Sequence, residues 1–275
     1  MRNKSFEQKY VIGVVGGLGP FAHIAFEKRL LDAAIRIVGA SDDQDFPRWI
    51  LSSIPQTPDR TLAICGNGPT PVPKLVESLK RLETLYDRNG EKVPGADFAV
   101  IVCNTAHQFL GEAQKRVSMP LLDMVEETSI KIARRYPGAR TGILATTGTL
   151  ECRIYHKSLE RHGLIPQSLL DITDGEAIQR RLVMETIYGE WDGNKFAGGG
   201  LKSGRLDNKY ANNFKKAAGL LIDSLNADLF IAGCTEIPIA LPGSEICGKS
   251  LADPMMIAAE KAVSVAYGLA PGFLP

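Results

Sequence analysis

Two cysteines stand in matching stretches of the chain. "ADFAVIVCNT" lines up with "ADLFIAGCTE", and Cys103 and Cys234 occupy the eighth position of these two stretches. Upstream, "YVIGVVGGLG" has a counterpart in "ARTGILATTGT". From Gly13 to Cys103 is 90 positions, and from Gly142 to Cys234 is 92. Two pairs of matching stretches, separated by nearly the same number of residues, predict two similar βα halves, each with one cysteine.

Each cysteine follows a strand-like run and stands where a helix is expected to begin. A helix N-terminus favours a thiolate through its dipole and its unpaired N–H groups. Two such thiols on opposite sides of a carbon can remove a proton from one face and deliver one to the other. The residues that follow offer groups that could bind carboxylate oxygens: Asn104, Thr105, Thr235 and Glu236. The pattern predicts a cofactor-independent racemase or epimerase that acts beside a carboxylate.

A glycine turn, "VGGLGP", follows the first strand-like run. Gly17, Gly19 and Ala22 formally match the dinucleotide fingerprint. That fingerprint calls for an acidic residue about twenty positions further on, at the end of the second strand. The second strand here ends "LSSIPQTPDR", with Ser and Pro at that point. We therefore expect no dinucleotide, and we expect Gly17 and Gly19 to form one wall of a small-molecule pocket, with Pro20 at the first helical position.

Short, continuous apolar runs are separated along the chain by segments whose apolar residues follow the helical period. The expected strands are 10–15, 49–53, 98–102, 141–145 and 229–232, with 164–170 compatible with a sixth, and the expected helices are 21–38, 74–88, 207–226 and 254–267. This order predicts an α/β fold of two pseudo-symmetric Rossmann-like (flavodoxin-like) parallel-sheet domains, with the active site in the cleft between them. We place the first domain at 1–122, completed by a C-terminal helix at 250–275, and the second at 123–249. The Gly-rich stretch 188–205 is expected to be a mobile loop, either a lid or a solvated insertion.

Composition excludes several classes of partner. The net charge of +1 over 275 residues gives no electrostatic reason to expect nucleic acid or an acidic membrane surface. We expect no membrane span and no secretory signal. Five dispersed cysteines without a C-x-x-C pair favour a reducing, cytoplasmic setting over a disulfide framework. Cys103 and His107 lack a third ligand at suitable spacing, so we expect no metal.

Five motifs occur in the order typical of one family: "GGLGP", "PQTPDRT", "CNTAH", "ATTGT" followed by a tyrosine, and "GCTEIP". On these motifs the chain resembles the aspartate/glutamate racemase family, which needs no pyridoxal phosphate, from Gly16 to the last helix. It is more similar to the aspartate racemase branch. "GGLGP" stands where glutamate racemases usually carry an Asp-Ser pair, and Glu236 stands where they usually have a histidine.

The resemblance implies that Cys103 and Cys234 are the acid/base thiols of an amino-acid racemase acting on aspartate or glutamate. It implies these substrate-binding residues: Gly17, Gly19, Gln56, Arg60, Asn104, Thr105, Thr146, Thr149 and Thr235. Arg60 would meet the side-chain carboxylate, because its planar fork can bind a carboxylate bidentately. No cofactor and a homodimer are also implied. From the residues themselves, we expect His107 to pack or to hydrogen-bond at the base of its helix, where it could also tune Cys103. We expect Glu236 to be either a partner of Cys234 or a first-turn acidic residue suited to the helix dipole.

The chain departs from the family pattern in three places. Val102 replaces a proline before the first cysteine, His23 stands where a threonine is frequent, and extra sequence occurs around 39–49 and 65–73. These departures leave the substrate open. Two alternatives therefore stay beside the racemase: a two-cysteine isomerase of a diacid such as maleate, and a non-catalytic protein that binds a nucleotide or a small acid.

Overall fold

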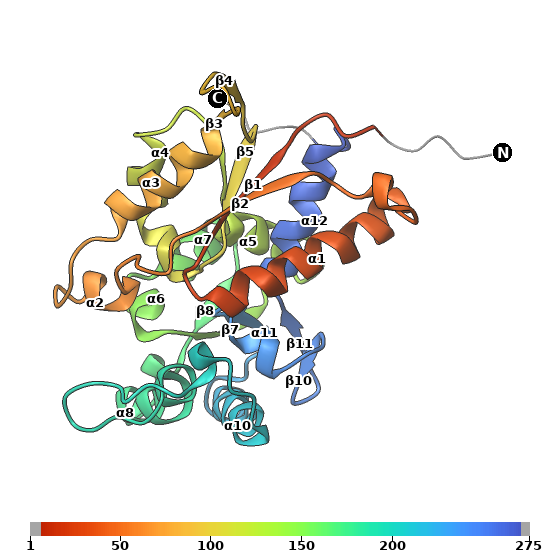
Figure 1. Cartoon of the computed structure of the whole chain (residues 1–275). Helices are drawn as coiled ribbons and strands as arrows, with labels where there is room; N and C mark the ends of the chain where they lie inside the picture. The colour runs from red at the N-terminus through yellow and green to blue at the C-terminus, as the bar shows by residue number, and fades with distance from the viewer. Residues whose placement is uncertain (1–6, 271–275) are drawn as a thin grey trace. The chain divides into compact units, whose positions relative to one another are not determined.

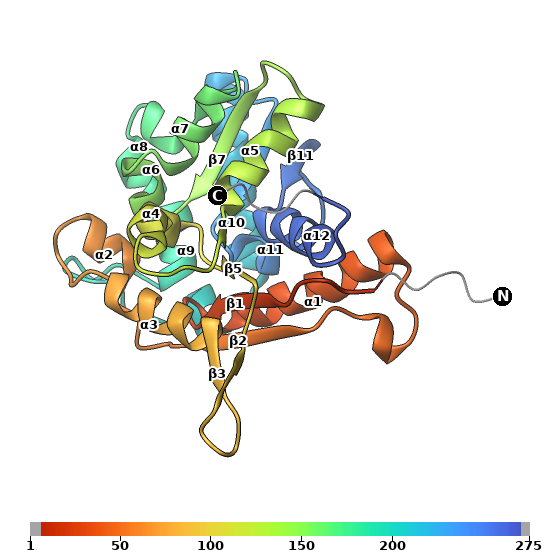
Figure 2. The same cartoon turned by 90° about the horizontal axis from the view of Figure 1, so that it is seen from above.

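The computed structural model describes residues 7–270 and divides into two compact units (Figure 1 and Figure 2). The first unit comprises the chain up to Asp59, Pro69–Met124 and the chain from Met255 onward. The second comprises Arg60–Gly68 and Val125–Pro254. The ends of the predicted first domain, 1–6 and 271–275, lie outside the described residues.

The first unit contains a parallel sheet with helices on both faces. Its strands run in the order β2 (Trp49–Ser53), β1 (Ile12–Gly16), β5 (Phe98–Ile101) and β6 (Leu121–Leu122). Its helices are α1 (Pro20–Val38), α3 (Val72–Glu83), α4 (Leu110–Gln114) and α12 (Pro254–Ala266), with the 3-10 turns η1 (Asp43–Asp45) and η2 (Thr105–Phe109). Successive side chains of β1 point to opposite faces, so Val14 packs with α1 and α12 while Val15 packs with α3. Figure 1 shows α3 and α1 on opposite sides of this sheet.

A short antiparallel hairpin stands apart from that sheet. It consists of β3 (Thr84–Tyr86) and β4 (Lys92–Pro94). The helix predicted at 74–88 therefore ends at Glu83, five residues early, because the chain turns extended at Thr84. Tyr86, which fits the helical period, is largely exposed on the hairpin.

The second unit also contains a sheet covered on both faces. Its strands run in the order β8 (Ile165–Gln167), β7 (Arg140–Ala145), β9 (Leu229–Gly233), β11 (Lys249–Ala252) and β10 (Glu245–Ile246), and only β10 is antiparallel among these described strands. Its longer helices are α5 (Met124–Arg135), α7 (Ile154–Arg161) and α10 (Asn208–Leu225). Shorter helical segments are α2 (Arg60–Ile64), α6 (Thr147–Glu151), η3 (Leu169–Asp171), α8 (Gly175–Gln179), the π-helix η4 (Arg180–Met184), α9 (Glu185–Tyr188), η5 (Leu201–Ser203) and α11 (Ile237–Ala240). Phe230 packs with residues of α10, and Ile231 packs with residues of α5 and α7.

The two sheets repeat one another, as the matching stretches predict. The order β2-β1-β5-β6 corresponds to β8-β7-β9-β11. The register agrees as well: Ile12 pairs with Phe98 in the first sheet, and the equivalent Thr141 pairs with Leu229 in the second. The predicted α/β class with parallel sheets is thereby confirmed.

One segment belongs to a different unit from the one expected. Residues 60–68 fall within the predicted first domain, but they pack with the second unit, where α2 contacts α6. The contact is close, since a Cβ on Gly148 would lie 3.0 Å from Thr61 Cα. The unit changes after Met124, two residues beyond the predicted boundary, and β11 belongs to the second unit although most of it falls within the predicted first domain. Within residues 7–270, no helix is long and apolar enough to cross a membrane.

Candidate active site

Cys103 lies just beyond the carboxyl end of β5 in the first unit. Val102 extends the strand by one residue, since its N–H donates to Val15 O at 3.1 Å, and the Cys103 N–H then donates to Ile101 O at 2.8 Å. Asn104 and Thr105 follow and open η2. All three residues from Cys103 to Thr105 are buried. Cys103 is thus placed at the strand end where ligands bind in open α/β sheets.

His107 is bonded to the backbone around Cys103, and its ring is in a defined tautomer. Its Nδ1 lies 2.9 Å from Cys103 O, and its Nε2 lies 3.1 Å from the Met124 N. A carbonyl oxygen can only accept and a backbone N–H can only donate, so Nδ1 carries the proton and Nε2 accepts. The ring is therefore neutral, and it joins the turn after β5 to Met124, the last residue of this segment of the first unit.

The glycine turn in the first unit is occupied by the chain's own groups. The Gly17 N–H donates to His23 Nδ1 at 3.2 Å, and burial lowers the pKa of His23 against the opposing charge of Glu27. Gly17 has φ +82°, and a Cβ there would lie 2.7 Å from the backbone of Ile54. The sequence led us to expect that these glycines let the backbone approach a ligand. At Gly17 the space is instead filled by the chain after β2, and the amide that a phosphate would need is bonded to His23.

Cys234 follows β9 directly in the second unit, and its thiol has a carboxylate partner. Cys234 Sγ donates to Glu236 Oε2 at 2.9 Å, and Thr235 Oγ1 donates to the same oxygen at 2.9 Å. The other oxygen, Glu236 Oε1, lies 3.3 Å from Lys202 Nζ. Cys234 and Glu236 are 5% and 2% exposed, so these contacts form away from bulk water.

The charges of this cluster determine where its protons lie. Burial disfavours an ionised Glu236, but the charge of Lys202 and the hydrogen bonds from Cys234 and Thr235 outweigh it and hold the pKa of Glu236 below its ordinary value. Burial and then the negative charge of Glu236 raise the pKa of Cys234 well above that of a free thiol, with Lys202 a partial offset. Burial lowers the pKa of Lys202, but the charge of Glu236 outweighs it and the pKa is raised. The cluster therefore contains a carboxylate, an ammonium and a protonated thiol.

Other predicted site residues lie in the same second unit. Thr146 is the N-cap residue of α6, and its hydroxyl lies 3.1 Å from that of Thr149; both are buried. Arg60, on α2, is also buried, and its charge lowers the pKa of Lys202. The second unit thus contains Arg60, Thr146, Thr149, Cys234, Thr235 and Glu236, and the first contains Gly17, Gly19, Gln56, Cys103, Asn104, Thr105 and His107. Gln56 is exposed, and Gly19, whose backbone is extended, is half-buried.

Sequence reasoning missed Lys202. It lies on η5 inside the Gly-rich stretch that the sequence predicts as a mobile loop. A lone lysine among glycines carries no signal of a buried ion pair.

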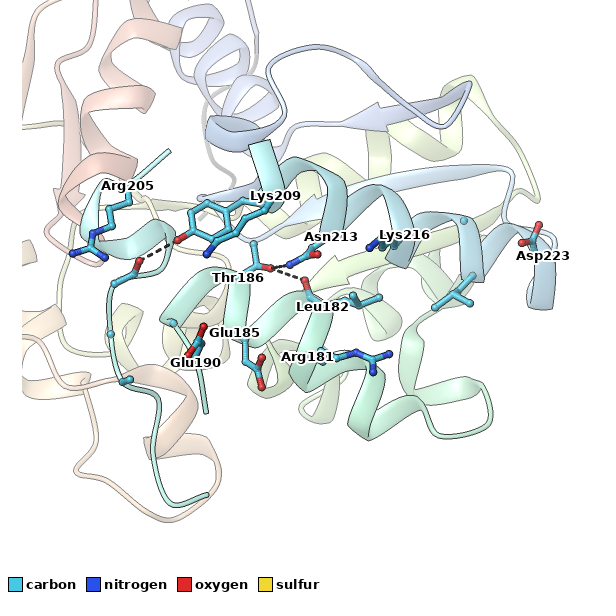
Figure 3. Close-up of a pocket in the computed structure, with 17 residues that line it drawn as sticks. Arg181, Leu182, Glu185, Thr186, Glu190, Arg205, Lys209, Asn213, Lys216 and Asp223 are labelled. Atoms are coloured by element: carbon cyan, nitrogen blue, oxygen red, sulfur yellow. Dashed lines mark hydrogen bonds between the residues drawn. The ribbon is translucent and has the colours of Figure 1, made fainter. Parts of the chain in front are cut away.

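A cavity of about 890 Å³ lies elsewhere in the second unit, between α9 and α10 (Figure 3). Asn213 and Thr186 point toward one another there and are joined by a hydrogen bond of 3.0 Å. Its charged lining residues are Arg181, Glu185, Glu190, Arg205, Lys209, Lys216 and Asp223. None of the residues predicted for the site lines this cavity. The described residues also contain no group of three or more His, Cys, Asp or Glu side chains placed to bind a metal ion.

Comparison with known proteins gives three kinds of similarity. A sequence model described as Asp/Glu/Hydantoin racemase matches residues 15–262. The chain is 31% identical over 156 residues to the broad specificity amino-acid racemase RacX of Bacillus subtilis (strain 168), a match that spans 56% of this chain and 62% of that relative.

Solved structures show the same fold. An aspartate racemase from Picrophilus torridus has a TM-score of 0.68 at 22% identity, covering 94% of this chain and 95% of its own. An aspartate racemase homologue from Pyrococcus horikoshii OT3 has a TM-score of 0.64 at 20% identity, covering 94% and 99%. A glutamate racemase from Campylobacter jejuni subsp. jejuni has a TM-score of 0.54 at 14% identity, covering 93% and 84%. Since the family match extends over most of the sequence and the fold agrees with it, the chain belongs to the Asp/Glu/hydantoin racemase family.

Proposed function

We propose that this protein is an amino-acid racemase that works without an added cofactor and uses Cys103 and Cys234 as its acid/base thiols. The observation that carries the proposal is the hydrogen bond from Cys234 Sγ to the buried carboxylate of Glu236. A cysteine with only a packing role needs no ionised partner, and burying that partner is costly. The contact therefore supports a role for this thiol in proton transfer.

The repeat supports the same role for Cys103. β5 and β9 occupy equivalent places in the two sheets, and each is followed within two residues by its cysteine. In the proposed reaction the thiolate of one cysteine removes the α-proton and becomes a thiol. The other thiol gives its proton to the opposite face of the carbon and becomes a thiolate. One enantiomer becomes the other, and atoms and charge balance.

The substrate we propose is a small acidic amino acid, aspartate or glutamate. The α-hydrogen of an amino acid is a weak acid, so the site must stabilise the charge that builds on the α-carboxylate. We assign that task to Asn104, Thr105 and Thr235, and the side-chain carboxylate to Arg60. Thr146 and Thr149 add hydroxyls, and all of these residues are buried next to strand ends, on α2 or on α6. The names of the similar proteins, which include aspartate and glutamate racemases, agree with this substrate class.

The decisive experiment is exchange of the α-hydrogen in deuterium oxide across a panel of L- and D-amino acids. We expect exchange and inversion with aspartate or glutamate and without cofactor, and loss of inversion in both Cys103→Ala and Cys234→Ala. Inversion by the double Cys→Ala protein would overturn the two-thiol mechanism. The diacid isomerase would show itself by a covalent adduct of maleate at one cysteine, seen by mass spectrometry. The homodimer and the cytoplasmic setting stay predictions.

A further inference from the structure

Within residues 7–270, Glu236 has one cation in direct contact. Glu236 is 2% exposed, and one oxygen of its carboxylate accepts hydrogen bonds from Cys234 and Thr235, while Lys202 Nζ lies 3.3 Å from the other oxygen. A buried carboxylate is strongly disfavoured unless a charge partner compensates for its lost hydration. Lys202 therefore decides whether Glu236 stays ionised.

The ammonium of Lys202 is oriented by its own surroundings. It lies 5.1 Å from the centre of the Tyr188 ring, a cation–π distance, and its side chain is 23% exposed. The charged and titratable groups that act on it are Glu236, Tyr188, Arg60 and Cys234. Of these, Arg60 disfavours the charged form of Lys202, and Glu236 favours it most strongly.

Close backbone packing places Lys202 beside Glu236. Gly200 leaves no room for a side chain, because a Cβ there would lie 2.6 Å from the Gly189 N. The Tyr210 hydroxyl donates to Gly199 O at 3.1 Å, and Leu201 is buried. The segment before Lys202 is therefore packed against α9 and α10, and the side chain of Lys202 leaves η5 toward Glu236.

We propose that Lys202 is a positioning residue that acts through Glu236: it keeps Glu236 a carboxylate, and this carboxylate keeps the proton of Cys234 on sulfur. In the resting protein Cys234 is then the proton donor, and Cys103 is left to act as the base. The roles of Cys234 as proton donor and Cys103 as base rest on the racemase activity proposed above. The effect of Lys202 on Glu236, and of Glu236 on Cys234, does not.

The test measures the thiol itself and needs no turnover. Iodoacetamide reacts with the thiolate, so the pH midpoint of its reaction with Cys234 reports the proton affinity of that thiol independently of access. Peptide mass spectrometry separates Cys234 from the other four cysteines. We compare the wild type with Lys202→Met, Lys202→Arg, Glu236→Gln and the double variant Lys202→Met/Glu236→Gln.

The single variants Glu236→Gln and Lys202→Met should move the midpoint in the same direction. Glu236→Gln removes a negative charge beside the thiolate, so the midpoint falls and alkylation below it becomes faster by about tenfold, the equivalent of one pKa unit. Lys202→Met leaves the buried carboxylate without its cation, so Glu236 takes up a proton and the negative charge beside the thiolate is lost. The midpoint then falls as well, and alkylation below it becomes faster by a similar factor. A midpoint that rises would overturn the proposal, because Lys202 would then act on the thiolate directly. Lys202→Arg keeps the cation and should stay near the wild type.

The double variant decides whether Lys202 acts through Glu236. We expect Lys202→Met to have little effect once Glu236 is Gln; an equal shift in both backgrounds would overturn the proposal, because Lys202 would then act on the thiol directly. Lys209→Met is the matched control, since Lys209 Nζ lies 5.3 Å from the centre of the Tyr210 ring and is not bonded to Glu236. It should leave the midpoint unchanged. A racemase-inactive wild type with these shifts would end the proposed function and leave the linkage standing.

Discussion

The two cysteines occupy equivalent places in two equivalent sheets, yet the chain secures them in different ways. Around Cys103, the neutral ring of His107 bonds the backbone carbonyl of the cysteine, and its thiol has no hydrogen-bond partner within residues 7–270. Around Cys234, the ionised Glu236 bonds the thiol itself. The repeat thus determines where the two cysteines lie in their sheets, and the residues two to four positions later determine which group of each cysteine, backbone carbonyl or thiol, has a side-chain partner.

The first turns of the two sheets differ in the same manner. Gly17 and Thr146 are equivalent positions, one after β1 and one after β7. Gly17 has φ +82° and packs against Ile54, whereas Thr146 has an ordinary extended backbone and is the N-cap residue of α6. The first unit uses this position for close backbone packing, and the second uses it for a buried hydroxyl.

Gly17→Ala tests this difference between the turns and should be strongly destabilising. The added Cβ would lie 2.7 Å from Ile54 backbone atoms at a positive φ, so it combines a steric overlap with left-handed strain. We expect a loss of about 3 kcal/mol in the free energy of unfolding, measured by urea denaturation. Gly39→Ala is the control, because Gly39 has φ +69° but no atom within 4 Å of its added Cβ. That control should lose only about 1 kcal/mol, and equal losses would show that the close approach to Ile54 is unimportant.

His107→Ala should have the next largest effect. It removes the acceptor for the Met124 N–H and the donor to Cys103 O, so two buried backbone groups lose a partner. We expect a loss of about 2 kcal/mol in urea denaturation. His162→Ala is the control: His162 Nε2 lies 2.7 Å from Glu126 Oε1, but that carboxylate also has Ser158 and Arg161 as partners. The control should lose under about 1 kcal/mol; similar losses for both histidines would mean that the backbone around Cys103 does not depend on His107.

The parts that sequence reasoning could predict are those that repeat or that follow a period. The alignment of the two cysteine stretches predicted two similar halves, and the two sheets have matching strand registers, because each stretch contains the corresponding central strand. Buried strands such as β9 are continuous apolar runs, and such runs are legible in one sequence.

The missed features depend on long-range packing. Residues 60–68 join the second unit through contacts between α2 and α6, two five-residue helices with no period to detect. Lys202 reaches Glu236 from a segment whose composition is typical of a loop. His23 bonds to Gly17, a partner six residues away that only the path of the turn brings close. Each of these contacts is set by tertiary structure, so no local pattern contains it.

The smallest difference between the halves lies at the start of the central strands, where Asp97 and Asp228 are equivalent. Asp97 Oδ2 accepts the Val11 N–H at 2.6 Å. Asp228 Oδ2 accepts the Arg140 N–H at 2.9 Å, and in addition its carboxylate receives both Nε and a terminal nitrogen of the Arg140 side chain. These bonds, with the charge of Arg140, lower the pKa of Asp228 to about 2.

Arg140→Gln removes the side-chain bonds to Asp228 and leaves the backbone bond, so Asp228 becomes similar to Asp97. Because the folded-state pKa of Asp228 lies below its ordinary value of 3.8, the stabilisation is present above that value and is lost as pH falls through about 2. Both side chains are about 40% exposed, so solvent screens the pair and the variant should lose little stability at pH 7. Carboxyl NMR should show the pKa of Asp228 rising toward 3.8 in Arg140→Gln and staying at about 2 in the control Arg153→Gln, which removes another exposed ion pair. A pKa of Asp228 that stays at about 2 in Arg140→Gln would mean that the bond from the backbone N–H causes the shift. The side chain of Arg140 would then make no electrostatic difference between the two halves.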